Sequence, residues 1–189
     1  AGGAVAGAGA ADSRAAADPL AAGEPLGGGR RARDAPDRNG DPMLRRALKR
    51  LVDAEAVKRA IEQAERRTSG EIRVSVSTFF WGNVRHTAER AFARLGMDRT
   101  AQRNSVLFFV VPSRRTFVVL GDEGIHAKVG QDFWDAVAAA MSARFKRRDF
   151  TGGLVYGITE AGSRLADHFP GQGPLDQNEL PDDVDFGDA

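Results

Sequence analysis

The chain contains no cysteine among its 189 residues. This absence excludes disulfides, thiol catalysis and thiolate metal sites, and it agrees with a reducing compartment. Long apolar runs are also missing, since no stretch approaches the roughly 18 apolar residues that a membrane-spanning helix needs. The Ala/Gly-rich beginning lacks the run of Leu, Ile or Phe that forms the core of a signal peptide. We therefore predict a cytoplasmic protein with no transmembrane segment.

Large apolar residues are scarce at the beginning of the chain, and basic residues are absent from its end. Residues 1–42 contain 22 Ala or Gly and no Ile, Phe, Tyr or Trp. Such a segment buries too little apolar surface to offset the entropy lost on ordering, so we predict that this head is disordered. Residues 171–189 contain six Asp or Glu and no Lys or Arg. We predict an acidic, disordered tail over residues 170–189.

The segment between the head and the tail is basic, with 22 Lys or Arg against 14 Asp or Glu. Such a charge attracts anions of any kind, including nucleic acid, anionic lipid and phosphorylated ligands. Arg-rich helix faces are more often simply solvated, and the acidic tail is able to neutralise them. We therefore expect no specific binding of nucleic acid.

Hydrophobic periodicity divides residues 53–169 into helices and strands. Asp53 stands at the N-cap position of an amphipathic helix that ends at Gly70. Glu71–Ser77 alternates between apolar and polar residues, which is typical of a half-buried strand. Ser105–Val111 is apolar throughout, as in a strand covered on both faces. Residues 43–52 are expected to form a short basic helix or linker, with Leu44, Leu48 and Leu51 at helical spacing. It either packs on the domain or is a surface helix that leans on a membrane. The other expected elements are a helix over 84–95, a strand over 116–120 in a hairpin with the preceding strand, a linker over 121–130, and helices from about Asp132 and Thr151.

The order of these elements, αβαββαα, predicts a single α/β domain over residues 53–169. We expect an αβα sandwich with a small mixed sheet. A helix joins the first two strands, so a right-handed crossover makes them parallel, and the hairpin makes the third strand antiparallel to the second. The beginnings of the first two strands and the end of the third then lie at one edge of the sheet.

Four polar residues should meet at that edge, namely Glu71, Asn104, Asp122 and Glu123, and we call them the acidic rim. Carboxylate and amide oxygens are ligands that Ca²⁺ and Mg²⁺ prefer, which makes the rim a candidate cation site. Alternatively, Asp122 and Glu123 cap the following turn or pair with Arg103 and Lys128. Both interpretations stay open at the level of sequence.

Other motifs carry less information about function. No Walker loop, Rossmann fingerprint or serine nucleophile elbow is present. The histidines His86, His126 and His168 are scattered without a partner at ligand spacing. The aromatic loop Phe79–Trp81 either covers the end of the core or serves as a tip that binds a partner.

Three segments together resemble the TPM domain family: Thr68–Ser77 (TSGEIRVSVS), Arg103–Ile125 (RNSVLFFVVPSRRTFVVLGDEGI) and Phe145–Ile158 (FKRRDFTGGLVYGI). The resemblance covers about residues 53–169, and Asn178–Pro181 (NELP) is similar to the tail of short bacterial members. It implies an αβα fold and, for some members, a divalent-cation site with weak acid phosphatase activity. It does not imply that every member is an enzyme.

The resemblance also bears on individual residues of the rim. Longer members have a Gly-x-Gly-Leu-Glu-Gly motif after the third strand, which places Glu123 and Gly124 on that motif. Those longer, membrane-associated members commonly carry Asp before the Asn that opens the second strand, and here Arg103 stands in its place. A cation replaces a potential metal ligand, although an arginine is also suited to hold a phosphate.

We therefore expect a noncatalytic or regulatory module that binds a protein partner or a divalent cation at the acidic rim. The alternative is a weak metal-dependent acid phosphatase. In that case Glu71, Asp122 and Glu123 would hold Ca²⁺ or Mg²⁺, and Arg103 would steady the phosphate. Asn104 is expected, with Arg103, to be a cofactor-binding residue. The sequence identifies neither substrate, partner nor oligomeric state.

Overall fold

The computed structural model describes residues 6–7, 42–78, 82–171 and 179–187. Its sheet contains β2 (Ile72–Val76), β3 (Val106–Val111) and β4 (Thr116–Gly121), with the two-residue β1 (Ala6–Gly7) beside β4. The strand order is β1-β4-β3-β2, with β2 parallel to β3 and β3 antiparallel to β4. The predicted mixed sheet and its strand directions are confirmed.

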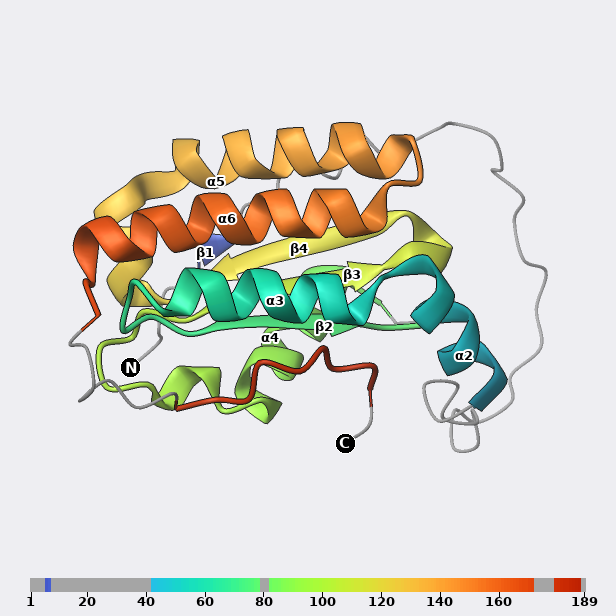
Figure 1. The fold of residues 1–189 in the computed structure, drawn as a ribbon, viewed down its shortest axis with the longest axis horizontal. Coiled ribbons are helices and arrows are strands. Elements are labelled where there is room, and N and C mark those ends of the chain that lie inside the picture. Colours follow the sequence, from blue (N-terminus) through green and yellow to red (C-terminus); the bar gives the residue numbers. More distant parts are fainter. Residues whose placement is uncertain (1–5, 8–41, 79–81, 172–178, 188–189) are drawn as a thin grey trace.

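Two layers of helices enclose the sheet (Figure 1). The helices are α2 (Pro42–Leu51), α3 (Ala54–Glu65), α4 (Val84–Arg94), α5 (Glu123–Lys146) and α6 (Phe150–His168). Helices α3, α5 and α6 lie on one face, and α4 covers the other together with the short 3-10 helix Met97–Arg99. None of the described helices is long and apolar enough to cross a membrane.

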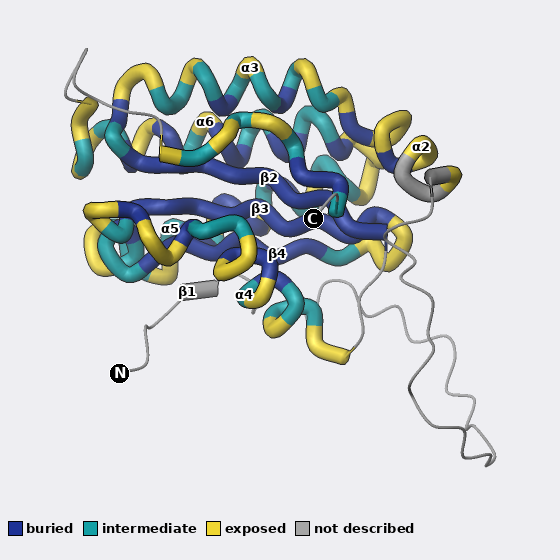
Figure 2. Tube along the Cα trace, turned by 90° about the horizontal axis from the view of Figure 1, so that it is seen from below, coloured by how far each residue is buried: buried dark blue, intermediate teal, exposed yellow. Residues whose placement is uncertain are grey.

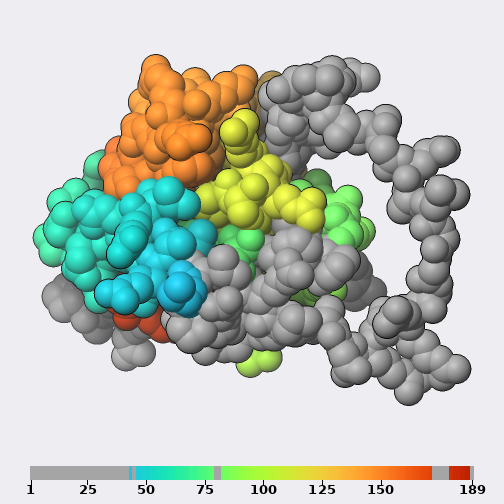
Figure 3. Space-filling view, turned by 90° about the vertical axis from the view of Figure 1, so that its right-hand side faces the viewer, coloured from blue at the N-terminus to red at the C-terminus, as the bar shows by residue number. Residues whose placement is uncertain are grey.

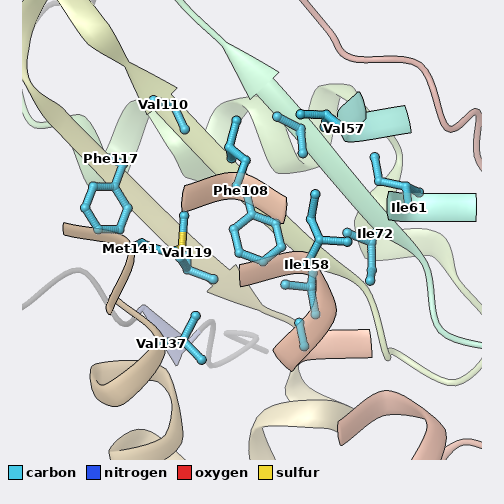
Figure 4. Close-up of a cluster of buried hydrophobic side chains, with 14 of the residues drawn as sticks. Val57, Ile61, Ile72, Phe108, Val110, Phe117, Val119, Val137, Met141 and Ile158 are labelled. Atoms are coloured by element: carbon cyan, nitrogen blue, oxygen red, sulfur yellow. The ribbon is translucent and has the colours of Figure 1, made fainter. Parts of the chain in front are cut away.

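The alternation of side chains along β3 produces two hydrophobic cores. Val106, Phe108 and Val110 point into the core under α3, α5 and α6, where Phe108 lies among Ile72, Ile158 and other apolar side chains (Figure 4). The intervening residues of β3 pack against α4. β2 and β3 are therefore buried along their whole length and β4 from Phe117 onward, while the outer faces of the helices are exposed (Figure 2). Burial on this scale is the main source of stability for a domain of this size.

The helix α2 packs on the domain, at the end of the molecule where the β3–β4 turn and the beginning of α6 also lie (Figure 3). Leu48 is buried, and so is Val52 just after the helix. Leu51, at helical spacing from Leu48, is 46% exposed. The contact with the core at this end of α2 is made by Val52, which precedes the N-cap residue Asp53 of α3.

Two predicted boundaries differ from the structure. The expected linker over 121–130 is helical from Glu123, because Asp122 accepts a hydrogen bond from the backbone N–H of Glu123 and caps α5. Gly130 interrupts this helix with φ of 73°, a backbone conformation that favours glycine. The predicted start of the last helix at Thr151 is shifted to Phe150, where Asp149 provides the cap.

The larger difference concerns the tail, which was expected to be disordered over residues 170–189. Residues 179–187 lie along β2 and α4, where Asp185 forms a parallel bridge with Ser75 and Phe186 is buried (Figure 1). This segment also explains why β2 is not the half-buried strand that was predicted. Arg73 and Ser75, on its polar face, are 7% and 2% exposed because the tail covers them.

Most of the predicted disordered head and the whole aromatic loop Phe79–Trp81 lie outside the described residues. Of the described residues of the head, Ala6 and Gly7 form β1, which pairs with the end of β4, and Pro42 begins α2.

Candidate functional site

The strands bring the acidic rim to one edge of the sheet. Ile72 pairs with Val106, and Val106 pairs with Gly121, so the three strand ends are level. Glu71, Asn104 and Asp122 are the residues next to or close to those ends, and all three are buried. The backbone prediction for the rim is therefore confirmed, but the side chains separate into two groups with different partners.

The first group is an ion pair between Arg103 and Asp122. The Nε and Nη2 atoms of Arg103 donate to the two carboxylate oxygens of Asp122 at 2.7 and 2.8 Å. Asp122 is fully buried, whereas the Arg103 side chain is 41% exposed. The hydrogen bonds to Asp122 raise the pKa of the Arg103 guanidinium above its usual range. Bidentate pairing of this kind is both strong and geometrically specific.

The backbone around the ion pair is confined by close contacts between the turn before β3 and the turn after β4. Arg103 has a φ of 52°, in the left-handed region that is costly for a residue with a side chain. The N–H of Gly124 donates to the carbonyl oxygen of Arg103 at 2.8 Å. A Cβ at position 124 would lie 2.5 Å from the carbonyl oxygen of Gln102 and 2.6 Å from that of Arg103. Glycine is therefore required where the β4–α5 turn meets the turn before β3.

The second group surrounds Glu71, whose carboxylate accepts hydrogen bonds from the tail. The backbone N–H groups of Glu179 and Leu180 donate to its two oxygens at 2.9 and 3.2 Å. Burial raises the pKa of Glu71 to about 7, with a further contribution from the carboxylates of Glu179 and Asp182, while the two hydrogen bonds act in the opposite direction. The first predicted metal ligand thus serves as an anchor for the tail.

The other two rim residues, Asn104 and Glu123, do not form a bridge between the Arg103–Asp122 pair and the group around Glu71. The Nδ2 of Asn104 donates to the carbonyl oxygen of Ser69 at 3.1 Å, and its Oδ1 is buried with no hydrogen-bond partner among the described residues. Glu123 is half-buried at the first position of α5. Within the described ranges, no three His, Cys, Asp or Glu side chains come together in a way that could hold a metal ion. Cation binding at the rim stays a prediction.

Sequence reasoning missed the residues that hold the tail. Asp185 accepts from Ser75 Oγ at 2.7 Å and from Arg94 Nη2 at 2.5 Å. Burial of Asp185 opposes its ionisation, but the hydrogen bonds from Arg94 and Ser75 outweigh that effect and lower its pKa. The apolar residues Val184 and Phe186 within an acidic segment could have revealed this contact, because disordered segments contain few β-branched and aromatic residues.

Comparisons with known proteins identify the family. The family model described as the TPM domain matches residues 48–164. The chain belongs to the TPM domain family. Its fold is similar to the NMR structure of the BA42 protein from the psychrophilic bacterium Bizionia argentinensis, with 41% identity, coverage of 70% of this chain and 91% of that chain, and a TM-score of 0.66.

A second solved structure of lower similarity is the N-terminal domain of the cg2496 protein from Corynebacterium glutamicum. It is 17% identical over 59% of this chain and 70% of that chain, with a TM-score of 0.47. No curated protein matched the chain. Membership of the TPM family confirms the resemblance that the three sequence segments carry.

Proposed function

We propose that this TPM domain is a noncatalytic module that binds a protein partner at the end of the sheet formed by the acidic rim. The observation that carries the proposal is the bidentate ion pair between Arg103 and Asp122. In a cation site the carboxylate oxygens of Asp122 would face the metal. In this chain they face a guanidinium group.

A divalent cation at Asp122 would have to displace that guanidinium. Both oxygens of the buried carboxylate accept from Arg103, and Oδ1 also accepts from the N–H of Glu123 at 2.8 Å. Ca²⁺ takes six to eight oxygen ligands and Mg²⁺ about six. The carboxylate of Glu71, which would have to contribute, accepts instead from the backbone of the tail. The internal contacts therefore compete with a metal at two of its three candidate ligands.

The alternative function is a weak metal-dependent acid phosphatase. Two observations favour it. The Arg103 side chain is 41% exposed and so accessible to a phosphate. The buried Oδ1 of Asn104 has no partner in the described part of the chain, and an amide oxygen is a ligand that a divalent cation takes. Phosphate binding by arginine is well suited to its planar set of donors. This function requires that the tail leave Glu71 and that Ca²⁺ or Mg²⁺ enter beside Asp122 and Glu123.

Thermal unfolding of the full chain with added Ca²⁺ or Mg²⁺ separates the two functions. A site with a Kd of about 1 mM would stabilise the protein by about 1.4 kcal/mol at about 10 mM cation. We expect no shift in Tm beyond that of NaCl at equal ionic strength, and no hydrolysis of p-nitrophenyl phosphate. Stabilisation that is lost in Glu123→Gln but kept in the control Glu55→Gln, an exposed residue of α3, would overturn the proposal and establish the cation site.

A further inference from the structure

One end of the domain brings together elements that are far apart in the sequence. The helix α2, the turn between β3 and β4 and the beginning of α6 meet there (Figure 3). The N–H of Asp53, just after α2, donates to Oγ1 of Thr151 in α6 at 3.0 Å. Phe145, near the end of α5, packs on Phe117 of β4 with their ring centres 5.1 Å apart. Because β3 ends and β4 begins here, this end is opposite the acidic rim.

Basic side chains outnumber acidic ones on the surface of this end. Eight exposed Lys or Arg belong to α2 and the two turns, and we call them the basic end: Arg46, Lys49, Arg50, Arg114, Arg115, Lys146, Arg147 and Arg148. The exposed acidic residues beside them are Asp53 and Glu55 at the beginning of α3 and Asp149 before α6. Asp53 and Asp149 each accept a backbone N–H and cap a helix. The surface therefore has an excess of positive charge, which attracts anions.

Two of these arginines occupy backbone positions that suit other residues better. Arg115 and Arg148 have φ of 51° and 62°, in the left-handed region. This conformation is unfavourable for a residue with a long side chain, and Gly or Asn adopts it more readily. The two turns therefore gain nothing in backbone stability from arginine, and the fold alone does not explain the basic charge there.

The outer face of α2 adds apolar side chains to this charge. Among the described residues, the large apolar side chains that are exposed are Met43, at 79%, and Leu51, at 46%. Helical spacing places Met43, Arg46 and Arg50 on one side of α2, whereas the buried Leu48 faces the domain. Apolar side chains beside Lys or Arg are typical of helices that lie at the interface of a membrane. The phosphates of a nucleic acid would offer Met43 and Leu51 no apolar partner.

We propose that the basic end docks on an anionic membrane surface, with α2 lying at the interface. The basic residues would contact lipid phosphates, while Met43 and Leu51 would enter the apolar region beneath the headgroups. Charge complementarity favours an anionic surface over a neutral one, and the exposed apolar pair favours a membrane over nucleic acid. The inference goes beyond the proposed function, because the acidic rim lies at the other end of the sheet and stays accessible to its partner.

Sedimentation of the full chain with lipid vesicles tests this docking. We expect binding to vesicles of equal parts of phosphatidylcholine and phosphatidylglycerol to be at least about tenfold tighter than binding to phosphatidylcholine alone. Binding should weaken at least about tenfold between about 0.1 M and about 1 M NaCl, because the Debye length falls from about 10 Å to about 3 Å.

Two pairs of substitutions locate the surface. Arg46→Gln with Arg50→Gln should weaken binding about tenfold or more, because each basic residue near an anionic membrane contributes about a fivefold gain in affinity. Arg66→Gln with Arg67→Gln removes the same charge from exposed positions just after α3, at the other end of the sheet. This control should change the affinity by less than about twofold, since charges beyond a Debye length are screened.

A third pair and one single substitution test the other parts of the surface. Arg147→Gln with Arg148→Asn should weaken binding about fivefold or more, and Asn suits the positive φ at position 148. Met43→Ser should weaken vesicle binding about threefold or more, because an apolar side chain no longer enters the membrane. Circular dichroism checks that each variant folds, and Leu51→Ser replaces Met43→Ser if the latter does not.

The proposal is overturned if the full chain binds anionic and neutral vesicles alike, or binds neither. Equal effects of the first two arginine pairs would also overturn it, because general charge and not the basic end would then cause the binding. Unchanged vesicle binding of Met43→Ser, together with tighter binding of the full chain to duplex DNA, would make nucleic acid the occupant instead. The response to Ca²⁺ or Mg²⁺ at the acidic rim is a separate measurement, so the proposed function can fail while this surface stands.

Discussion

The burial of Glu71 beneath the tail predicts that the protein loses stability as the pH rises. The pKa of this carboxyl is about 7 in the folded protein and 4.5 in the ordinary case. Between those two values the folded state holds a proton that the unfolded state has released, so the free energy of unfolding falls with rising pH. One pKa unit corresponds to about 1.36 kcal/mol, which puts the full loss at about 3 kcal/mol or less.

Glu65 acts in the same direction over a higher range. Because its pKa is about 9, Glu65 continues to contribute to the loss of stability above neutral pH. Because the charge of Glu71 contributes to the raised pKa of Glu65, the two titrations are coupled and the slope of stability against pH is the quantity to measure. Both groups lie under the tail, so the slope reports on its docking.

Urea unfolding at pH values from about 5 to about 8 measures this slope. We expect Glu71→Gln to flatten the curve below about pH 7, because the side chain keeps an acceptor for the tail but no longer binds a proton. Glu55→Gln, which removes an exposed acidic side chain from α3, is the matched control. A slope in Glu71→Gln equal to that of the unmodified protein, or a stability that rises over this range, would refute the reasoning.

Three substitutions test other contacts by urea unfolding. Phe186→Ala should lower the free energy of unfolding by about 3 kcal/mol, because a buried aromatic ring is lost from the core; a loss below about 1 kcal/mol would contradict its place there. Arg103→Ala should cost about 2 kcal/mol, since the buried Asp122 loses its ionic partner while the exposure of Arg103 lets water replace part of it. Arg103→Lys should recover less than half of that loss, because an ammonium cannot form both bonds. Gly124→Ala should cost about 1–3 kcal/mol by forcing the two backbone turns apart, and an unchanged stability would show that they are free to separate.

The fold was largely predictable because its signals are local. Asp53 accepts from the N–H of Ala56 as an N-cap should, and the apolar run of β3 is buried on both faces. The strand directions followed from the connections between the elements. The start of α5 was missed because Gly121 and Gly124 resemble loop residues, whereas both are required by close contacts, with Trp134 at the first and backbone at the second.

The candidate site was predictable in its backbone and, in part, in its side chains. Level strand ends follow from topology, and the alternative that Asp122 caps the following turn or pairs with Arg103 is confirmed in both of its forms. The positive φ of Arg103 could not be predicted, because no residue preference indicates it. The anchors of the tail are contacts over about a hundred residues of sequence, between Ser75 and Asp185 for example, and composition alone favoured disorder for such an acidic segment.

The contacts of the tail hold it at both of its ends. Phe186 and Asp185 are buried with suitable partners, which fixes the end of the segment on the domain. Its beginning is held by Glu71, which accepts from the N–H groups of Glu179 and Leu180, and by Arg73, which donates to the carbonyl oxygen of Pro181. A cation that used Glu71 as a ligand would therefore have to displace a segment that is anchored at several points.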